Sequence, residues 1–393
     1  MKTMKYNFDE IVERFNTNSL KYDSAKRRNM PEGLIPMWVA DMDFKSPPEV
    51  IDAIIKRAEH GIYGYSEPDD DYFETVSGWF LKRHNLMVDK SNTLLMPGVV
   101  FTINLAIHAF TNKGDGVLIQ KPVYHPFFQS IQANERKVIN NPLKNVGGRY
   151  EIDFSDFERK IAENNVKLFI LCSPHNPVGR VWSKDELNKM GEICKKYGVV
   201  VVSDEIHNEF VFDAPFTSFW NAGAGFDEFS IICTATSKAF NQPGLINANV
   251  FINNEEIKQK ILKELDKTGY SIYSAFGIVA TKAAYKYGGD WINELNAYLK
   301  NTINFVDFYL KENIPKIKLT KIEGTYLLWL DFRELKKSQK ELADIIVNKA
   351  KLWLHNGLTF GEEGEGYFRM NIATPLSTVK KALDNLKEAF REL

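Results

Sequence analysis

The middle of the chain alternates short, continuous apolar runs with helical patterns, and this alternation limits the possible folds more than any other feature of the sequence. The apolar runs cover residues 166–172, 199–202, 230–234 and 248–252. Strands that are apolar on both faces and separated by helices imply a mostly parallel sheet covered by helices on both sides. A chain of 393 residues, 44% of them hydrophobic, is long enough for such an α/β domain and a smaller second domain.

One helix of this region is marked at both ends. Ser183 and Glu186 form a capping box, in which the Ser hydroxyl accepts a backbone N–H and the Glu side chain reaches back to the N-cap. Gly198 is placed to end the helix. The apolar face of the helix is predicted to comprise Leu187, Met190, Ile193 and Cys194.

The pattern changes from about residue 285 onward. Long amphipathic helices are predicted over residues 291–311, 339–351 and 378–393, together with strands over 326–331 and 367–372. We interpret this part as a smaller α+β domain, to which the N-terminal residues also contribute. The predicted division is a large domain of residues 47–284 and a small domain of residues 1–46 and 285–393.

The composition excludes several classes of partner. Lys and Arg total 50 against 51 for Asp and Glu, so charge gives no reason to expect nucleic acid or an anionic membrane. Three scattered cysteines do not suggest a disulfide framework. The N-terminus has no apolar run typical of a signal peptide, and no stretch approaches a membrane span. We therefore expect a cytoplasmic protein.

Four polar clusters lie where a parallel sheet binds its ligands, beyond the carboxyl ends of the strands. They cover residues 97–102, 173–179, 203–207 and 234–241. Taken singly, each has an ordinary explanation as a turn, a helix cap or a surface charge. Together they supply a lysine for an imine, a carboxylate for a pyridine nitrogen and a helix N-terminus for a phosphate. These are the requirements of pyridoxal phosphate (PLP).

The motifs in these clusters resemble a known family. Ser-Pro-His-Asn-Pro-Val-Gly at 173–179, Ser-Asp-Glu-Ile-His at 203–207 and Ser-Lys-Ala-Phe-Asn at 237–241 are similar to fold-type I PLP enzymes of aminotransferase class I/II. The resemblance covers nearly the whole chain and implies the aspartate-aminotransferase fold. Three further stretches resemble the cystathionine β-lyase (carbon–sulfur lyase) branch of the MalY/PatB type, at residues 36–44, 324–333 and 368–375.

The resemblance implies roles for the residues around the cofactor. Lys238 would carry PLP as a Schiff base and move the α-proton of the substrate. Asp204 would pair with the pyridinium N–H, Tyr124 would stack on the ring, and Asn176 would hydrogen-bond the ring hydroxyl. The phosphate would be held by the backbone amides of Val99 and Val100 and the hydroxyl of Ser237.

The resemblance also implies how substrate and subunits are bound. Arg369 would bind the α-carboxylate of an amino acid through its planar fork, with Asn176, Tyr124 and Ala40 also contacting substrate. Tyr65 would reach the phosphate in the other subunit, which implies a homodimer with active sites at the interface. No metal ion is implied.

Two positions depart from the general aminotransferase pattern. His207 stands where many members carry Tyr, so it is either a cofactor contact or a structural histidine with its hydrogen bonds satisfied. Residues 242–247 offer no Arg to clamp the phosphate. Both departures fit the carbon–sulfur lyase branch, but they leave the phosphate clamp open.

The resulting hypothesis is a PLP-dependent β-lyase that cleaves cysteine thioethers to a thiol, pyruvate and ammonia. An aminotransferase is the alternative, because it shares the removal of the α-proton. A non-catalytic regulator that keeps the fold is a third possibility, against which the intact Lys238, Asp204 and Arg369 argue.

Overall fold

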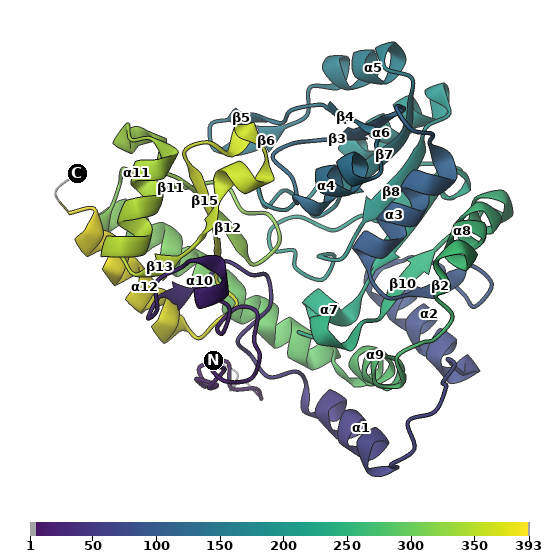
Figure 1. Cartoon of the computed structure of the whole chain (residues 1–393), viewed down its shortest axis with the longest axis horizontal. Helices are drawn as coiled ribbons and strands as arrows, with labels where there is room; N and C mark the ends of the chain where they lie inside the picture. The colour runs from purple at the N-terminus through teal and green to yellow at the C-terminus, as the bar shows by residue number, and fades with distance from the viewer. Residues whose placement is uncertain (1–4, 392–393) are drawn as a thin grey trace.

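The computed structural model describes residues 5–391 and contains two main sheets, which lie side by side in Figure 1. The strands are β1 (Ile35–Pro36), β2 (Thr93–Met96), β3 (Gly116–Ile119), β4 (Lys137–Asn140), β5 (Lys144–Val146), β6 (Arg149–Glu151), β7 (Val166–Cys172), β8 (Val200–Asp204), β9 (Ser230–Thr234), β10 (Ala248–Phe251), β11 (Lys318–Leu319), β12 (Leu327–Asp331), β13 (Leu352–Trp353), β14 (His355–Asn356) and β15 (Tyr367–Asn371). The helices are α1 (Pro48–Glu59), α2 (Asp70–His84), α3 (Val99–Phe110), α4 (Pro126–Ala133), α5 (Phe154–Glu163), α6 (Lys184–Tyr197), α7 (Thr236–Ala239), α8 (Glu255–Thr268), α9 (Ala275–Tyr287), α10 (Gly289–Asn313), α11 (Gln339–Asp344) and α12 (Leu376–Ala389).

The large sheet has seven strands in the order β2-β10-β9-β8-β7-β3-β4 and is mostly parallel, as predicted. Strand β10 is the exception, because it runs antiparallel to both β9 and β2. The chain leaves β9 at its carboxyl end, forms α7 and a 3-10 helix (Pro243–Leu245), and enters β10 without crossing back over the sheet. The apolar pattern at residues 248–252 identified a buried strand but not its direction.

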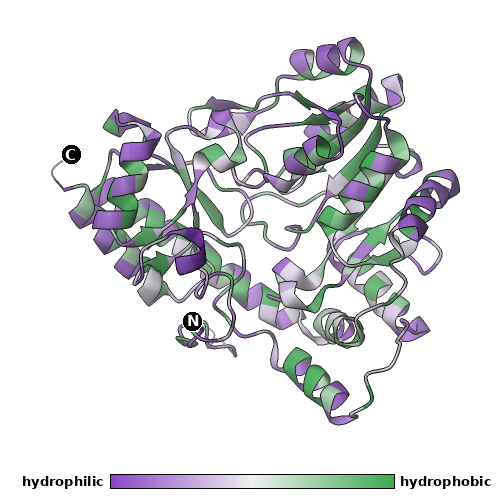
Figure 2. Cartoon of the chain, in the orientation of Figure 1, coloured by the Kyte–Doolittle hydropathy of each residue, from purple (hydrophilic) through white to green (hydrophobic). Residues whose placement is uncertain are grey.

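Side chains alternate between two hydrophobic cores on the two faces of this sheet. In β7, Leu168 and Ile170 join the core under α3, while Phe169 and Leu171 join the core under α5 and α6. Both faces are therefore apolar, which explains the continuous apolar runs. In Figure 2 the strands are largely green, whereas the exposed sides of the outer helices are purple. The predicted helix with the capping box is α6, and its box is formed.

The small sheet is antiparallel, in the order β11-β12-β15-β14, with α10 and α12 packed near it. Strand β1 pairs with β13, so the N-terminal residues join the C-terminal elements, as the purple segment beside the yellow-green one shows in Figure 1. The predicted boundary at residue 284 falls within the last turn of α9, and the division into two domains stays a prediction.

The helix predicted over residues 339–351 is shorter than expected. The α-helical part ends at Asp344 and continues as a π-helix over Ile345–Lys349, whose wider turn carries Ile345 and Ile346 into the core. The last helix ends at Ala389, and residues 392–393 of its predicted span lie outside the described residues. Among the described residues, no helix is long and apolar enough to cross a membrane.

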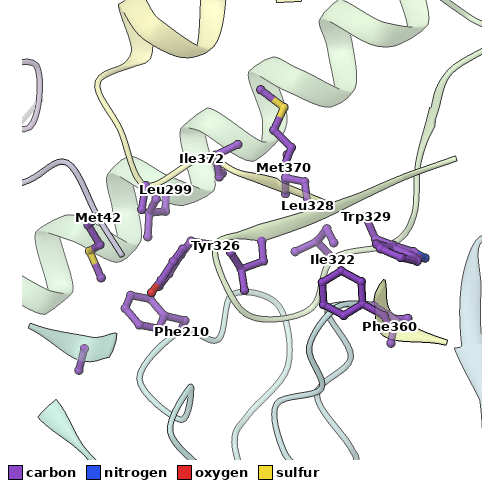
Figure 3. Close-up of a cluster of buried hydrophobic side chains, with 14 of the residues drawn as sticks. Met42, Phe210, Leu299, Ile322, Tyr326, Leu328, Trp329, Phe360, Met370 and Ile372 are labelled. Atoms are coloured by element: carbon purple, nitrogen blue, oxygen red, sulfur yellow. The ribbon is translucent and has the colours of Figure 1, made fainter. Parts of the chain in front are cut away.

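An aromatic contact joins the two sheets beside the carboxyl edge of the large one (Figure 3). Phe210, from the loop after β8, packs edge-on against Tyr326 with ring centroids 4.8 Å apart. The backbone N–H of Thr325 also donates to the carbonyl of Phe210 at 2.9 Å. This contact fixes the loop that contains His207 against the start of β12.

Candidate active site

A cavity of about 840 Å³ lies at the carboxyl edge of the large sheet and extends to the small sheet and the N-terminal segment. Every site residue predicted from the sequence lines it, with the exception of Tyr65. These residues are Ala40, Val99, Val100, Tyr124, Asn176, Asp204, His207, Ser237, Lys238 and Arg369.

The first turn of α3 presents backbone amides to this cavity. The turn follows β2 directly, and its N-cap, Gly98, has no side chain that could accept a hydrogen bond. The amides of Val99 and Val100 have no acceptor within the helix, because the first four N–H groups of an α-helix lack one. Ser237, in α7, lines the same cavity. The turn and the hydroxyl are suited to a phosphate group.

Asp204 is the last residue of β8 and is buried, with an exposed fraction of 4%. Its carboxylate accepts one hydrogen bond, from the backbone N–H of Ile206 at 3.1 Å. Burial raises the pKa of Asp204 to about 7. A carboxylate in this state lacks a cationic partner, and the N–H of a pyridinium ring would supply one.

Lys238 lies in α7, just beyond β9. Its Nζ donates a hydrogen bond to the carbonyl oxygen of Ala40 at 2.8 Å, and the hydroxyl of Tyr326 donates to the same oxygen at 2.9 Å. Burial, together with the charge of Arg369, lowers the pKa of Lys238 to about 8. Near neutral pH the amine is therefore neutral far more often than an ordinary lysine, which favours its use as a nucleophile or base.

Arg369 projects from β15, and its side chain is buried. One terminal nitrogen donates to Oδ1 of Asn176 at 2.9 Å, and the other donates to the carbonyl oxygen of Trp38 at 2.7 Å and to Nδ1 of His355 at 3.1 Å. Its Nε has no hydrogen-bond partner. Burial lowers the pKa of Arg369 to about 10, so the group stays charged at neutral pH.

His207 lines the cavity with its ring 5.7 Å from that of Tyr326. Its buried Nδ1 has no hydrogen-bond partner, and burial lowers the pKa of the ring well below its ordinary value. His207 is therefore not a structural histidine with all its hydrogen bonds satisfied. The ring is neutral, and one of its nitrogens lacks a hydrogen-bond partner.

These groups fit PLP. The cavity combines a lysine of lowered pKa, a buried carboxylate without a cationic partner, and free amides at a helix N-terminus. Tyr124, whose pKa burial raises, provides an aromatic wall. The segment expected to lack a phosphate clamp contributes Pro243, Ile246 and Asn247, none of which is cationic.

Several cavity residues were not predicted as site residues. His125 could have been identified from the sequence, because it directly follows Tyr124, which was predicted as a site residue. His355 is brought to the site by the register of β14 and β15, which sets it opposite Arg369. Arg28 belongs to a short 3-10 helix (Lys26–Arg28), and no local pattern indicates that it lines the cavity.

Tyr65 lies away from the cavity, on the loop between α1 and α2, and is 90% exposed. It shares a separate surface hollow with Tyr63, Ile272 and Phe276. Ile62, Tyr63 and Ile272 are also more than half exposed, so an apolar surface surrounds it. Within one chain, the structure does not bring Tyr65 to the other site residues.

Comparisons with known proteins agree with this geometry. A profile of the family described as Aminotransferase class I and II matches residues 33–386. The cystathionine β-lyase PatB of Bacillus subtilis is 39% identical over 98% of this chain and 100% of its own length. A PLP-bound protein of Clostridium difficile 630, provisionally named an aminotransferase, is 41% identical with a TM-score of 0.95, over 98% of this chain and 99% of its own. Cystalysin of Treponema denticola, which contains PLP, is 36% identical with a TM-score of 0.95, over 99% of this chain and 100% of its own.

Proposed function

The chain belongs to the aminotransferase class I and II family, and from this premise we propose that it is a PLP-dependent carbon–sulfur β-lyase. It cleaves a cysteine thioether of the cystathionine type into a thiol, pyruvate and ammonia. The observation that carries this proposal is the full-length similarity to a cystathionine β-lyase. The cavity is chemically suited to PLP, but removal of an α-proton by Lys238 is equally the first step of transamination.

The residues of the cavity have separate roles in this reaction. When bound, PLP draws electrons away from the substrate Cα, so that the α-proton becomes acidic and the β-thiolate can leave. Lys238 would hold the cofactor, and its Nζ in the neutral form would accept the proton from Cα. Asp204 would stabilise the protonated form of the ring nitrogen. Its carboxylate is available for this role because it is buried and accepts a single hydrogen bond from the protein.

Arg369 binds the α-carboxylate of the substrate. Its guanidinium is held between Asn176 and the carbonyl of Trp38, and Nε is left for a further acceptor. Tyr124 would pack against the cofactor ring, Asn176 would hydrogen-bond its hydroxyl, and His207 would contact the same group. The amides of Val99 and Val100 and the Ser237 hydroxyl would bind its phosphate. Ala40, whose carbonyl anchors Lys238 and Tyr326, lies against the substrate.

The active form is a homodimer in which Tyr65 reaches the phosphate of the partner subunit. Support comes from the exposure of Tyr65 and of the apolar residues Ile62, Tyr63 and Ile272 around it. An exposed apolar patch of this kind is typical of an interface. Light scattering at assay concentration should report a dimer, and a fully active monomer would remove this role of Tyr65.

The decisive experiment is pyruvate release from L-cystathionine by the purified holoenzyme, with and without an added α-keto acid. The β-lyase should turn over many times without the keto acid, because the thiolate leaves and no amino acceptor is needed. Alanine, which has no leaving group at Cβ, should give no sustained turnover. If thioethers and alanine alike require the keto acid for multiple turnovers, the enzyme is an aminotransferase.

A further inference from the structure

Three side chains lining the cavity carry a positive charge at neutral pH, and the proposed reaction uses two of them. Lys238 serves the cofactor and Arg369 serves the α-carboxylate, whereas Arg28 has no role in that scheme. Asp204 is the carboxylate among the lining residues, and it is assigned to the ring nitrogen. Arg28 is therefore a cation in the cavity wall without an assigned anion.

Arg28 is held in place by an aromatic platform. Its guanidinium lies over the ring of Trp38, 4.8 Å from the centroid. Trp38 in turn stacks on Trp353 with ring centroids 4.3 Å apart and an interplanar angle of 11°. Within residues 5–391, Arg28 forms no ion pair with a carboxylate. The platform fixes the cation and leaves its charge-assisted hydrogen bonds to another partner.

The platform also sets Arg28 beside Arg369. The carbonyl oxygen of Trp38 accepts a hydrogen bond from Arg369, while its ring carries Arg28. His355 lies between them, with its ring centroid 6.2 Å from that of Trp38 and its Nδ1 bonded to Arg369. A guanidinium has no acceptor atom, so Nδ1 of His355 must be the acceptor and the neutral ring carries its proton on Nε2.

The two histidines that line this part of the cavity, His125 and His355, are neutral. Burial and the charge of Arg369 lower the pKa of His355 to about 2 and that of His125 to about 4. The two rings meet edge-on with centroids 5.6 Å apart, and the buried Nδ1 of His125 has no hydrogen-bond partner. Apart from Arg369, Arg28 is thus the cation beside two histidines that are neutral donors and acceptors.

We infer that Arg28 binds a second carboxylate of the substrate, carried by the thiol that leaves, so that the preferred substrates are thioethers with an acidic group at the end distal to the cysteine. Arg369 binds the α-carboxylate, and Arg28 binds the other, with His125 and His355 lining the path between them. The inference rests on the proposed function for the reaction, but the recognition of two carboxylates is a property of binding and is measurable without turnover.

A direct binding test uses thiodipropionate, a dicarboxylic thioether that lacks the amino group needed for reaction, and ethylthiopropanoate, its counterpart without the second carboxylate. Calorimetry on the holoenzyme should show about tenfold tighter binding of the dicarboxylate, as for one charge-assisted contact at a partly solvated rim. Arg28→Gln should abolish this preference and Arg28→Lys should keep part of it. Equal affinities in the wild type would overturn the inference, whether or not the protein is a lyase.

A kinetic test compares S-carboxyethyl-L-cysteine with S-ethyl-L-cysteine. Arg28→Gln should lower about tenfold the ratio of kcat/KM for S-carboxyethyl-L-cysteine to kcat/KM for S-ethyl-L-cysteine. The change should come from a higher KM for S-carboxyethyl-L-cysteine. Arg27→Gln is the matched control, because Arg27 lies in the same 3-10 helix, is exposed like Arg28 and does not line the cavity, and it should leave the ratio unchanged. Wild-type enzyme that releases pyruvate from neither thioether contradicts the proposed function. Cleavage of both with a ratio insensitive to Arg28→Gln contradicts the role of Arg28.

Discussion

Two groups of buried charge lie beyond the strands of the large sheet, and their charges are paired to very different degrees. In the first, the guanidinium of Arg180 donates to both carboxylate oxygens of Glu186, at 2.9 and 2.8 Å, and to Glu323 at 2.7 Å. Burial opposes the ionisation of Glu323, yet hydrogen bonds from Arg149 and Arg180 outweigh it and lower the pKa of this carboxyl. In this Arg180 cluster (Arg149, Arg180, Glu186 and Glu323), each charge has a partner.

In the second group, Asp204 and Arg369 are buried and Lys238 is half-buried, but no carboxylate and cation among them form an ion pair. Burial shifts the pKa of each toward the neutral form. The contrast indicates that charges removed from solvent give stability where they are matched and reactivity where they are not. Four predictions test this contrast.

The largest effect is expected for Lys238→Ala. Loss of the residue that holds PLP and moves the α-proton should lower pyruvate release by about 10⁴-fold or more. The folded protein should not lose stability, because the substitution removes a buried charge with no counter-ion. Borohydride reduction followed by mass spectrometry should place the pyridoxyl adduct on Lys238 in the wild type. An adduct on a different lysine would contradict the assignment.

Arg180→Met should have the opposite effect to Lys238→Ala: it should lower the stability of the fold and change activity much less. It leaves two carboxylates facing each other in a buried site, so the free energy of unfolding should fall by about 3–5 kcal/mol. The activity per folded molecule should change far less than in Lys238→Ala. Urea unfolding measures the loss, with Arg159→Met as the control on an exposed ion pair, where no measurable change is expected. A large loss of activity with unchanged stability would show that the two groups are not distinct.

The pH dependence of stability should have opposite signs in the two groups. The pKa of Asp204 rises from an ordinary 3.8 to about 7 on folding, so between these values the folded state holds a proton that the unfolded chain has lost. The stability that Asp204 contributes is therefore complete below pH 3.8 and is lost as the pH rises to about 7. Above pH 7 the cofactor-free Asp204→Asn variant should be more stable than the wild type by about 2–4 kcal/mol.

Glu323→Gln provides the comparison for that measurement. Because folding lowers the pKa of Glu323, its contribution is present above the ordinary value of 4.5 and is lost as the pH falls below it. Unfolding free energies of both variants and the wild type across this pH range test the signs. Parallel pH profiles for the two variants would contradict the distinction between matched and unmatched charge.

Arg369→Lys should have the smallest effect of the four. An ammonium keeps the charge but cannot make the two-pronged hydrogen bond to a carboxylate, so KM should rise about tenfold to a hundredfold with a smaller change in kcat. Steady-state kinetics with L-cystathionine measure the split. An unchanged KM would mean that the α-carboxylate is bound elsewhere.

Much of the fold could be predicted from the sequence because its signals are local. Apolar runs marked β7, β8 and β9, and the capping box and Gly198 marked both ends of α6. The direction of β10 and the π-helical end of the segment after α11 were missed. Strand direction depends on where the connecting chain runs, and a wider helical turn depends on packing against neighbours, so neither leaves a mark within a short window of sequence.

The sequence by itself determined the chemistry of the site, because a lysine, a carboxylate and a free helix N-terminus after successive strands must meet at one edge of the sheet. The tertiary structure decided the surroundings. The register of β14 and β15 places His355 beside Arg369, and the stacked pair of Trp38 and Trp353 carries Arg28 to the same wall. Of these contacts, the stacking of Trp38 on Trp353 joins segments hundreds of residues apart. These contacts arise from the packing of two sheets and the N-terminal segment, which no local pattern encodes.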